Sequence, residues 1–363
     1  MKRIAIAAAL VLTLTSCGST AKSESDGNIV QDITEGQSVS EVNEVSEVPK
    51  DKNCEITELE RGLSSVSFSG DYKFEQFLAE GGAESDNGVI AFLAKNLIGD
   101  ALSEFGAGNF GCSSFSAKGE DGYYFGRNFD WYNCNALIVT THPDSGYSSI
   151  CTVNTDFIGL GSNALGDEVL TMAAIYAPID GMNEKGLCVS VNMVQDNERV
   201  DQKTSKPDIT TTTAVRLLLD KASDVDEAVK LLEQYDMHAS KGMTVHFAVA
   251  DANGKCVAVE YLGGEMIVTE TPVVTNFYFA EGDKNGIGTE QSHERYDILM
   301  ETLSEKDSFT SDEVMEALDS VSKHNYIDGE TTEWSAVFNQ STGEAVYCHR
   351  ENYDKKYTFN INE

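Results

Sequence analysis

The stretch from Gly111 to Asp130, GCSSFSAKGEDGYYFGRNFD, restricts how this chain can fold more than any other segment. Its Asp121-Gly122 pair separates two runs rich in aromatic and small residues, which is a strong signal for a β-hairpin. We predict one strand over residues 112–116 and a returning strand over residues 123–128. A tight turn between them brings the residues near Trp131 back opposite Cys112.

Cys112 is a candidate nucleophile, and the hairpin places Arg127 and Asp130 beside it. These two residues are an odd number of positions apart. A regular strand points such residues to opposite faces of its sheet. If both serve one site, the sequence predicts that the strand ends or bulges between them.

The same stretch resembles the N-terminal-nucleophile amide hydrolases of the choloylglycine hydrolase and penicillin V acylase family. The mature chain of that family begins with Cys and continues into a hairpin that carries Gly-Arg-Asn-x-Asp. Here Cys112 is followed by Gly126-Arg127-Asn128-Phe129-Asp130. Cys112 lies deep in the chain, so it offers a free α-amine only if the Gly111–Cys112 bond is cut. Acid ceramidase-like relatives mature in this way, by self-cleavage before a Cys.

Further blocks of the chain are similar to that family and supply the other candidate residues. The block Asp180 to Leu187, DGMNEKGL, leads to Asn192, near the place of a family residue that donates to the oxyanion. Asn276 matches the Asn of a family Thr-Asn pair, although Phe277-Tyr278 replaces the small residue and Pro that usually follow. Arg295 matches a family Arg at the head of a helix. The resemblance covers residues 111 to 363.

The resemblance implies a chemical role for these residues. A thiol must lose its proton to a base before it attacks, and the α-amine of an N-terminal Cys112 is that base. Arg127 favours the thiolate, Asp130 holds the α-ammonium, and Asn276 with Asn192 donates to the oxyanion. The implied reaction is hydrolysis of a linear amide C–N bond without a cofactor or metal. The implied partner is a small-molecule N-acyl amide, such as a conjugated bile salt, penicillin V or an N-acyl amino acid.

Other functions stay open on the sequence. The same nucleophile could pass its acyl group to another amine, as an acyltransferase does. His246 could pair with a cysteine in a protease-like enzyme, although its apolar strand favours a core histidine. A non-catalytic, lipid-anchored solute-binding protein and a family member that has lost self-cleavage also fit. Taken singly, Cys112 is also explained as a core thiol, and Arg127 with Asp130 as a structural ion pair.

Residues 1–17 are predicted to form a lipoprotein-type signal peptide. A basic start precedes an apolar run from Ile4 to Leu14, which is too short to span a bilayer. The sequence Leu14-Thr15-Ser16-Cys17 resembles a bacterial lipoprotein cleavage box, so Cys17 is expected to carry the lipid anchor. The predicted location is therefore outside the cytoplasm, anchored to the bacterial cell membrane. The alternative is an ordinary signal peptide and a secreted protein.

Composition and periodicity divide the remaining chain. Residues 18–60 are acidic and polar, which predicts a disordered tether. Residues 61–111 are predicted to be a helical prosegment cut at Gly111, with helical periodicity over 72–78 and 88–105; the alternative is a helical cap that is never cleaved. Residues 112–363 alternate antiparallel strands, paired helices and more antiparallel strands. This order predicts an α+β fold, a four-layer αββα sandwich with two antiparallel sheets between helix layers.

The formal net charge of −34 excludes some classes of partner. It argues against nucleic acid, whose phosphates need Lys and Arg, and against charge-driven adhesion to anionic lipid. Membrane contact is therefore expected through the lipid anchor alone, and a homo-oligomer is left open. No Cys/His spacing typical of a zinc site occurs. Six further cysteines remain besides Cys17 and Cys112: Cys54, Cys134, Cys151, Cys188, Cys256 and Cys348. Most of these six are predicted to be buried free thiols.

Overall fold

The computed structural model describes residues 54–98, 111–158, 166–327 and 329–363. Its larger sheet has nine strands. Neighbouring strands pair antiparallel except for one parallel pair, β2 with β5. In spatial order the strands are β1 (Thr57–Glu60), β2 (Leu63–Ser69), β5 (Ala136–His142), β6 (Ser149–Asn154), β7 (Asp180–Asn183), β8 (Cys188–Met193), β11 (Val245–Ala250), β12 (Cys256–Leu262) and β13 (Glu265–Glu270).

The second sheet has six strands, all paired antiparallel. In spatial order they are β14 (Val273–Val274), β3 (Gly111–Gly119), β4 (Gly122–Trp131), β15 (Thr331–Asn339), β16 (Glu344–His349) and β17 (Tyr357–Asn360). The short strands β9 (Asp208–Thr210) and β10 (Asp236–His238) form a separate parallel pair.

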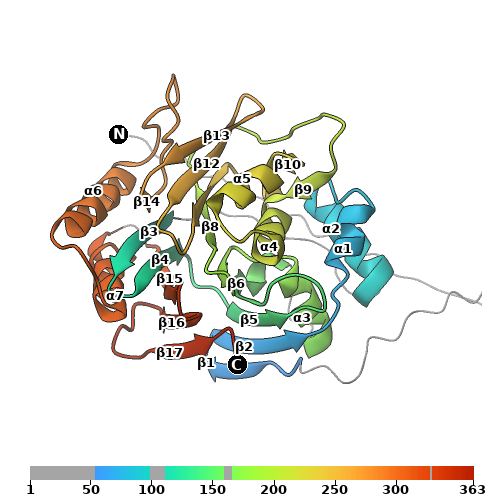
Figure 1. The fold of residues 1–363 in the computed structure, drawn as a ribbon, viewed down its shortest axis with the longest axis horizontal. Coiled ribbons are helices and arrows are strands. Elements are labelled where there is room, and N and C mark those ends of the chain that lie inside the picture. Colours follow the sequence, from blue (N-terminus) through green and yellow to red (C-terminus); the bar gives the residue numbers. More distant parts are fainter. Residues whose placement is uncertain (1–53, 99–110, 159–165, 328) are drawn as a thin grey trace, which may run out of the picture. The chain divides into compact units, whose positions relative to one another are not determined.

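Helices cover the outer faces of both sheets (Figure 1). Against the nine-stranded sheet pack α3 (Asp167–Ile175), α4 (Thr211–Lys221) and α5 (Val225–Leu232), and against the six-stranded sheet pack α6 (Glu290–Ser304) and α7 (Ser311–Ser320). The predicted order of layers, αββα, is therefore confirmed. Before β3 come α1 (Phe74–Ala79), α2 (Asp86–Leu93) and a π-helical turn over Ala94–Ile98. Among the described residues, no helix is long and apolar enough to cross a membrane.

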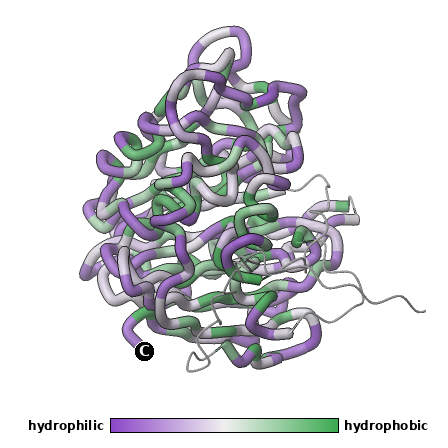
Figure 2. Tube along the Cα trace, turned by 90° about the vertical axis from the view of Figure 1, so that its right-hand side faces the viewer, coloured by the Kyte–Doolittle hydropathy of each residue, from purple (hydrophilic) through white to green (hydrophobic). Residues whose placement is uncertain are grey.

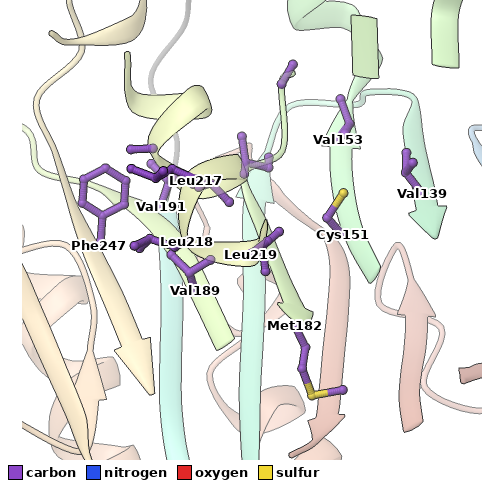
Figure 3. Close-up of a cluster of buried hydrophobic side chains, with 14 of the residues drawn as sticks. Val139, Cys151, Val153, Met182, Val189, Val191, Leu217, Leu218, Leu219 and Phe247 are labelled. Atoms are coloured by element: carbon purple, nitrogen blue, oxygen red, sulfur yellow. The ribbon is translucent and has the colours of Figure 1, made fainter. Parts of the chain in front are cut away.

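The outer face of the nine-stranded sheet is apolar. Figure 3 shows Leu217 and Leu218 of α4 beside Val189 and Val191 of β8, and all four side chains are buried. Figure 2 shows hydrophobic residues concentrated within the body of the fold and hydrophilic ones along its outline. Because side chains alternate along a strand, Ser190, between these two valines, faces the other sheet. There the Ser190 hydroxyl lies 2.7 Å from the hydroxyl of Ser114 in β3, so the contact between the sheets is polar at this point.

The hairpin predicted around Asp121-Gly122 is confirmed. β3 and β4 pair without interruption from Gly111 opposite Asp130 to Gly119 opposite Gly122, which leaves Glu120 and Asp121 as the turn. Gly122 has a φ of +144°, and an added Cβ would lie 1.9 Å from the Ser341 hydroxyl. The turn therefore needs glycine at this position. Cys112 lies opposite Phe129, two positions before Trp131.

The start of the predicted helical prosegment is a strand, which corrects that prediction. β2 lies within residues 61–111 and pairs in parallel with β5, and β1 lies inside the expected tether. The reason is a two-residue period, in which the buried Val66 and Phe68 alternate with serines. Helices do occur where the helical period was found, over Phe74–Ala79 and Asp86–Leu93. The predicted end of the second helix at Phe105 lies outside the described residues.

Five of the six remaining cysteines are free and buried, as predicted for most of this set: Cys134, Cys151, Cys188, Cys256 and Cys348. Cys54 is also buried. Desolvation explains their chemistry, because burial raises the pKa of Cys151 and of Cys256 to about 12. Cys17 lies outside the described residues. These thiols are inert packing groups at neutral pH.

Candidate active site

Cys112 lies at the start of β3, and protein groups surround both its side chain and its backbone. Its thiol is fully buried between the two sheets, with Sγ 3.5 Å from the carbonyl oxygen of Val191 in β8. Its N–H donates to Asn276 Oδ1 at 2.8 Å, and its carbonyl oxygen accepts from Arg295 Nη1 at 2.7 Å. The N–H of the Gly111–Cys112 peptide and the carbonyl group of Cys112 are therefore both held by hydrogen bonds to side chains.

Strand β14 explains why Asn276 reaches this N–H. β14 pairs with β3 in a register that places Val274 opposite Ser114, and it ends there. A continued ladder would bring the backbone of Asn276 opposite Cys112. Because the strand has ended, the side-chain oxygen of Asn276 takes the place of a backbone acceptor.

Arg127 and Asp130 lie on opposite faces of the six-stranded sheet, Arg127 on the side of the Cys112 thiol and Asp130 on the side of Arg295. β4 stays in regular register with β3, so the bulge expected between these two residues does not occur there. The register shift lies instead in the neighbouring strand β15, between Thr332 and Trp334. The site needs no bulge because Cys112 contributes to both faces: its thiol points between the sheets, and its carbonyl oxygen meets Arg295 of α6.

On the face between the sheets, the buried guanidinium of Arg127 connects three groups. It donates to the carbonyl oxygen of Val191 at 2.8 Å, to Asn192 Oδ1 at 3.3 Å and to Asp180 Oδ2 at 3.3 Å. Asp180 is fully buried and also accepts from the Trp334 indole at 2.9 Å. Burial raises the pKa of Asp180, and the positive charge of Arg127 opposes that rise.

On the helix-side face, Arg295 joins Asp130 and Asn276 to the backbone of Cys112. Its Nη1 lies 2.6 Å from Ser113 Oγ and 3.4 Å from Asp130 Oδ2, and its Nη2 donates to Asn276 Oδ1 at 2.7 Å. The other carboxylate oxygen of Asp130 accepts from the Thr332 hydroxyl at 2.8 Å. Asn276 and Arg295 therefore contact Cys112 directly, and Asp130 contacts Arg295. Arg127 meets the thiol at the Val191 carbonyl oxygen.

Asn192 also lies in this network, but its amide is engaged elsewhere. Its Nδ2 donates to the carbonyl oxygen of Val274 at 3.0 Å, and its Oδ1 accepts from Ser190 and Ser114. Asn276 Nδ2 is engaged as well, with the carbonyl oxygen of Met193 at 2.6 Å. In the intact chain both predicted oxyanion donors already serve protein carbonyls, and their role as oxyanion donors stays a prediction.

Two residues of the site were not predicted from the sequence: Asp180, which contacts Arg127, and Thr332, which contacts Asp130. Asp180 opens the DGMNEKGL block, where an Asp before Gly is read most simply as a turn former. Its burial beside Arg127 is a tertiary property. Among the described residues, no group of three or more His, Cys, Asp and Glu side chains is arranged to hold a metal ion.

The pKa of Cys112 leads to a prediction about the intact chain. Burial raises this pKa from 9.0 to about 11, and Arg127 opposes the rise. The thiol therefore stays protonated at neutral pH, and its thiolate fraction near pH 8 is about 100-fold below that of an ordinary thiol. Iodoacetamide should label Cys112 of the folded intact chain at least about 100-fold more slowly than in guanidinium-unfolded chain, and the rate should rise with pH up to about 11. Peptide mapping measures this; equal labelling rates would contradict it.

Comparisons with known proteins identify the family of this chain. A family model described as acyl-coenzyme A:6-aminopenicillanic acid acyl-transferase matches residues 117–353. The chain belongs to this family. The matched range includes Arg127, Asp130, Asn192, Asn276 and Arg295, and it begins just after Cys112. The penicillin V acylase of Pectobacterium atrosepticum is 30% identical over 99 residues, which is 24% of this chain and 26% of that protein. The alignment thus spans about a quarter of the curated relative.

Solved structures share the fold of this family member. A mutant of the conjugated bile acid hydrolase from Clostridium perfringens matches with a TM-score of 0.54 and 17% identity, over 69% of this chain and 92% of that chain. The penicillin V acylase from Agrobacterium tumefaciens matches with a TM-score of 0.51 and 18% identity, over 69% and 87%. The predicted resemblance and the four-layer fold are both confirmed.

Proposed function

We propose that this family member hydrolyses linear amide C–N bonds, with Cys112 as nucleophile after the Gly111–Cys112 bond is cut. The observation that carries the proposal is the network around the backbone of Cys112. Asn276 accepts its N–H and Arg295 donates to its carbonyl oxygen. Every buried backbone group needs a partner, but here side chains rather than a neighbouring strand supply both partners. Side chains can keep a nitrogen and a carbonyl group in place after the peptide bond between Gly111 and Cys112 is cut, which supports a function for that nitrogen.

The proposed maturation is a peptide-bond rearrangement. The Cys112 sulfur adds to the carbonyl carbon of Gly111, the thiol proton passes to the Cys112 nitrogen, and the C–N bond breaks to leave a thioester. Water then hydrolyses the thioester, which releases Gly111 as a carboxylate and restores the thiol beside a free α-amine. A Cβ on Gly111 would lie 3.0 Å from Asp130 Oδ2 and 3.2 Å from Lys323 Cε. A side chain here would press against the carboxylate proposed to hold the new amine.

In turnover the freed α-amine takes the thiol proton. An α-amine titrates near ~7.7–8.0, so it exchanges protons close to neutral pH. Asn276 Oδ1, which accepts the N–H of the intact peptide, is placed to accept from that amine. The thiolate attacks the substrate carbonyl and expels the amine, and water hydrolyses the acyl-enzyme. Since Cys112 is fully buried in the intact chain, hydrolysis should begin only after cleavage.

N-terminal sequencing combined with an amide panel tests the proposal. Active protein should contain a chain that begins Cys-Ser-Ser-Phe, the sequence from Cys112 onward. Amine release from N-acyl amides of different acyl length should follow the cleaved fraction as it accumulates. Active protein in which the Cys112 nitrogen is still bonded to Gly111 would contradict the mechanism.

Acyl transfer is a second candidate, because the printed description of the family model names an acyl-transferase. Both reactions use the same acyl-enzyme and differ in what accepts the acyl group. Adding a primary amine to the hydrolysis assay separates them, because a transferase forms a new amide at the expense of the free acid. A non-catalytic binding protein predicts neither product and no cut before Cys112.

We also propose, from the sequence, that Cys17 anchors the protein by lipid outside the cytoplasm. The lipoprotein-type box Leu14 to Cys17 supports this, and residues 1–53 lie outside the described residues. Cys17→Ala should abolish incorporation of radiolabelled fatty acid and move the protein from the membrane to the soluble fraction. Unchanged labelling would rule out Cys17 as the lipid attachment site.

A further inference from the structure

A fully buried pair of titratable side chains, His246 and Glu260, lies outside the predicted site. They belong to the neighbouring strands β11 and β12, and His246 Nδ1 lies 3.0 Å from Glu260 Oε1. His246 Nε2 lies 2.7 Å from the carbonyl oxygen of Thr275. Both ring nitrogens are thus occupied by groups other than the Cys112 thiol, which leaves the protease-like pairing of His246 with this cysteine without support.

The pair holds the chain on both sides of Asn276. His246 donates to Thr275, the residue before it. Glu260 accepts from the N–H of Phe279 at 3.0 Å and from the N–H of Ala280 at 2.6 Å, just after it. The ring of Phe279 also stacks on the imidazole, with centroids 5.8 Å apart. Two backbone N–H groups and one imidazole nitrogen therefore meet at one buried carboxylate.

The acceptor groups in this network determine which atoms of His246 and Glu260 carry a hydrogen. The Thr275 oxygen can only accept, so Nε2 of His246 must carry a proton. A single further proton is then shared between Nδ1 and the Glu260 carboxylate. Removing either partner leaves the other buried without its ligand, which is costly in a dry interior. Buried pairs of this kind are poor sources of stability, but they hold one geometry tightly.

Ser292 of α6 holds Asn276 and Thr275 by further hydrogen bonds. Its N–H donates to the Ser292 hydroxyl at 2.6 Å, and the Thr275 hydroxyl donates to the Ser292 carbonyl oxygen at 2.9 Å. Its side chain then meets the Cys112 N–H and Arg295. The path from the His246–Glu260 pair to the scissile peptide thus passes through one backbone carbonyl and one amide side chain.

We propose that His246 and Glu260 are positioning residues, which set the side chain of Asn276 against the Cys112 nitrogen during both self-cleavage and turnover. This inference rests on the proposed function. A displacement of about 1 Å at a reacting centre can cost about 100-fold in rate. His246→Gln is therefore expected to slow cleavage at Gly111–Cys112 by about 10- to 100-fold. In the cleaved fraction, kcat for an N-acyl amide should fall while KM stays unchanged.

The experiment follows the cleaved fraction by intact mass for wild type, His246→Gln and Glu260→Gln, with thermal unfolding measured on each. The matched control is His349→Gln. His349 is also a buried histidine paired with a glutamate, with Nδ1 2.7 Å from Glu60 Oε1. That pair ties β16 to β1 and has no contact with Asn276. His349→Gln should lose similar thermal stability but keep the wild-type rate of cleavage and the wild-type kcat.

Each outcome decides the inference. Slow cleavage in both pair variants, at a stability matched by His349→Gln, supports it. Wild-type rates in His246→Gln, or an equal slowing in His349→Gln, overturn it and leave the proposed function standing. If His246→Gln does not fold, the double variant with Glu260→Gln restores a neutral pair, and rapid cleavage in that folded protein overturns the inference. If wild type itself is never cleaved before Cys112, the proposed function falls and this inference with it.

Discussion

Cys112→Ala is expected to leave the chain intact and to abolish amide hydrolysis. The other described thiols lie elsewhere in the core, and Cys112 is the one whose backbone meets Asn276 and Arg295. Removing the nucleophile of a hydrolase typically costs on the order of 10⁶-fold in kcat. Intact mass should show one full-length species where wild type gives two fragments that meet at residues 111 and 112, and amine release from an N-acyl amide should fall to background.

Two variants separate this result from a packing effect. Cys188→Ala removes another fully buried thiol, in β8, and should keep both cleavage and hydrolysis. Cys112→Ser keeps a weaker nucleophile of similar size, so it should accumulate intact chain that is cleaved slowly or not at all. Cleavage at residues 111 and 112 in Cys112→Ala would show that a protease does the cutting, and the rearrangement mechanism would be wrong.

Arg127→Met is expected to cause the largest loss of stability. Arg127 and Asp180 are both fully buried, and removing the guanidinium leaves a buried carboxylate with neutral donors such as the Trp334 indole but without its positive partner. Breaking a buried ion pair from one side costs about 3–5 kcal/mol. Guanidinium denaturation of the variant and of wild type, each also carrying Cys112→Ala so that all chains are intact, gives this difference in the free energy of unfolding.

The loss should depend on pH in a direction fixed by Asp180. Its pKa is already raised in the folded protein, and Arg127 is the group that opposes the rise, so the variant raises the pKa further. A raised carboxyl pKa means that the folded state holds its proton at higher pH than the unfolded chain does. Stability is therefore retained at low pH and lost as pH rises through the folded pKa. The deficit of Arg127→Met should be larger near pH 7.5 than near pH 5.

Matched variants test this explanation. Arg127→Met combined with Asp180→Asn should recover much of the stability near neutral pH and lose the extra pH dependence, because no buried charge remains. Arg216→Met breaks a second buried pair, Arg216 with Asp220 at 2.8 Å in α4. It should also destabilise the protein, but only the Arg127 variants should slow cleavage when Cys112 is present. A deficit for Arg127→Met that is the same at both pH values would contradict the assignment to Asp180.

Local pattern was enough for much of the fold. The hairpin of β3 and β4 followed from a turn pair between strand-forming runs, and α1 and α2 overlap the segments where helical periodicity was found, residues 72–78 and 88–105. These elements are set by interactions between neighbours in the chain. The failure at β2 has a different origin. Its seven residues are four serines and three apolar residues, which is a weak local signal, and the strand is stabilised by pairing with the distant β5.

The sequence by itself determined the family and a set of candidate residues, because Cys112, Arg127, Asp130, Asn276 and Arg295 lie in short motifs that can be recognised before their partners are known. The tertiary structure alone decided how they meet. It placed Arg127 and Asp130 on opposite faces of one regular strand, brought in Asp180 and Thr332, and set His246 and Glu260 behind Asn276. The physical reason is that burial and hydrogen bonding between strands far apart in sequence depend on the packing of two sheets, which no local pattern encodes.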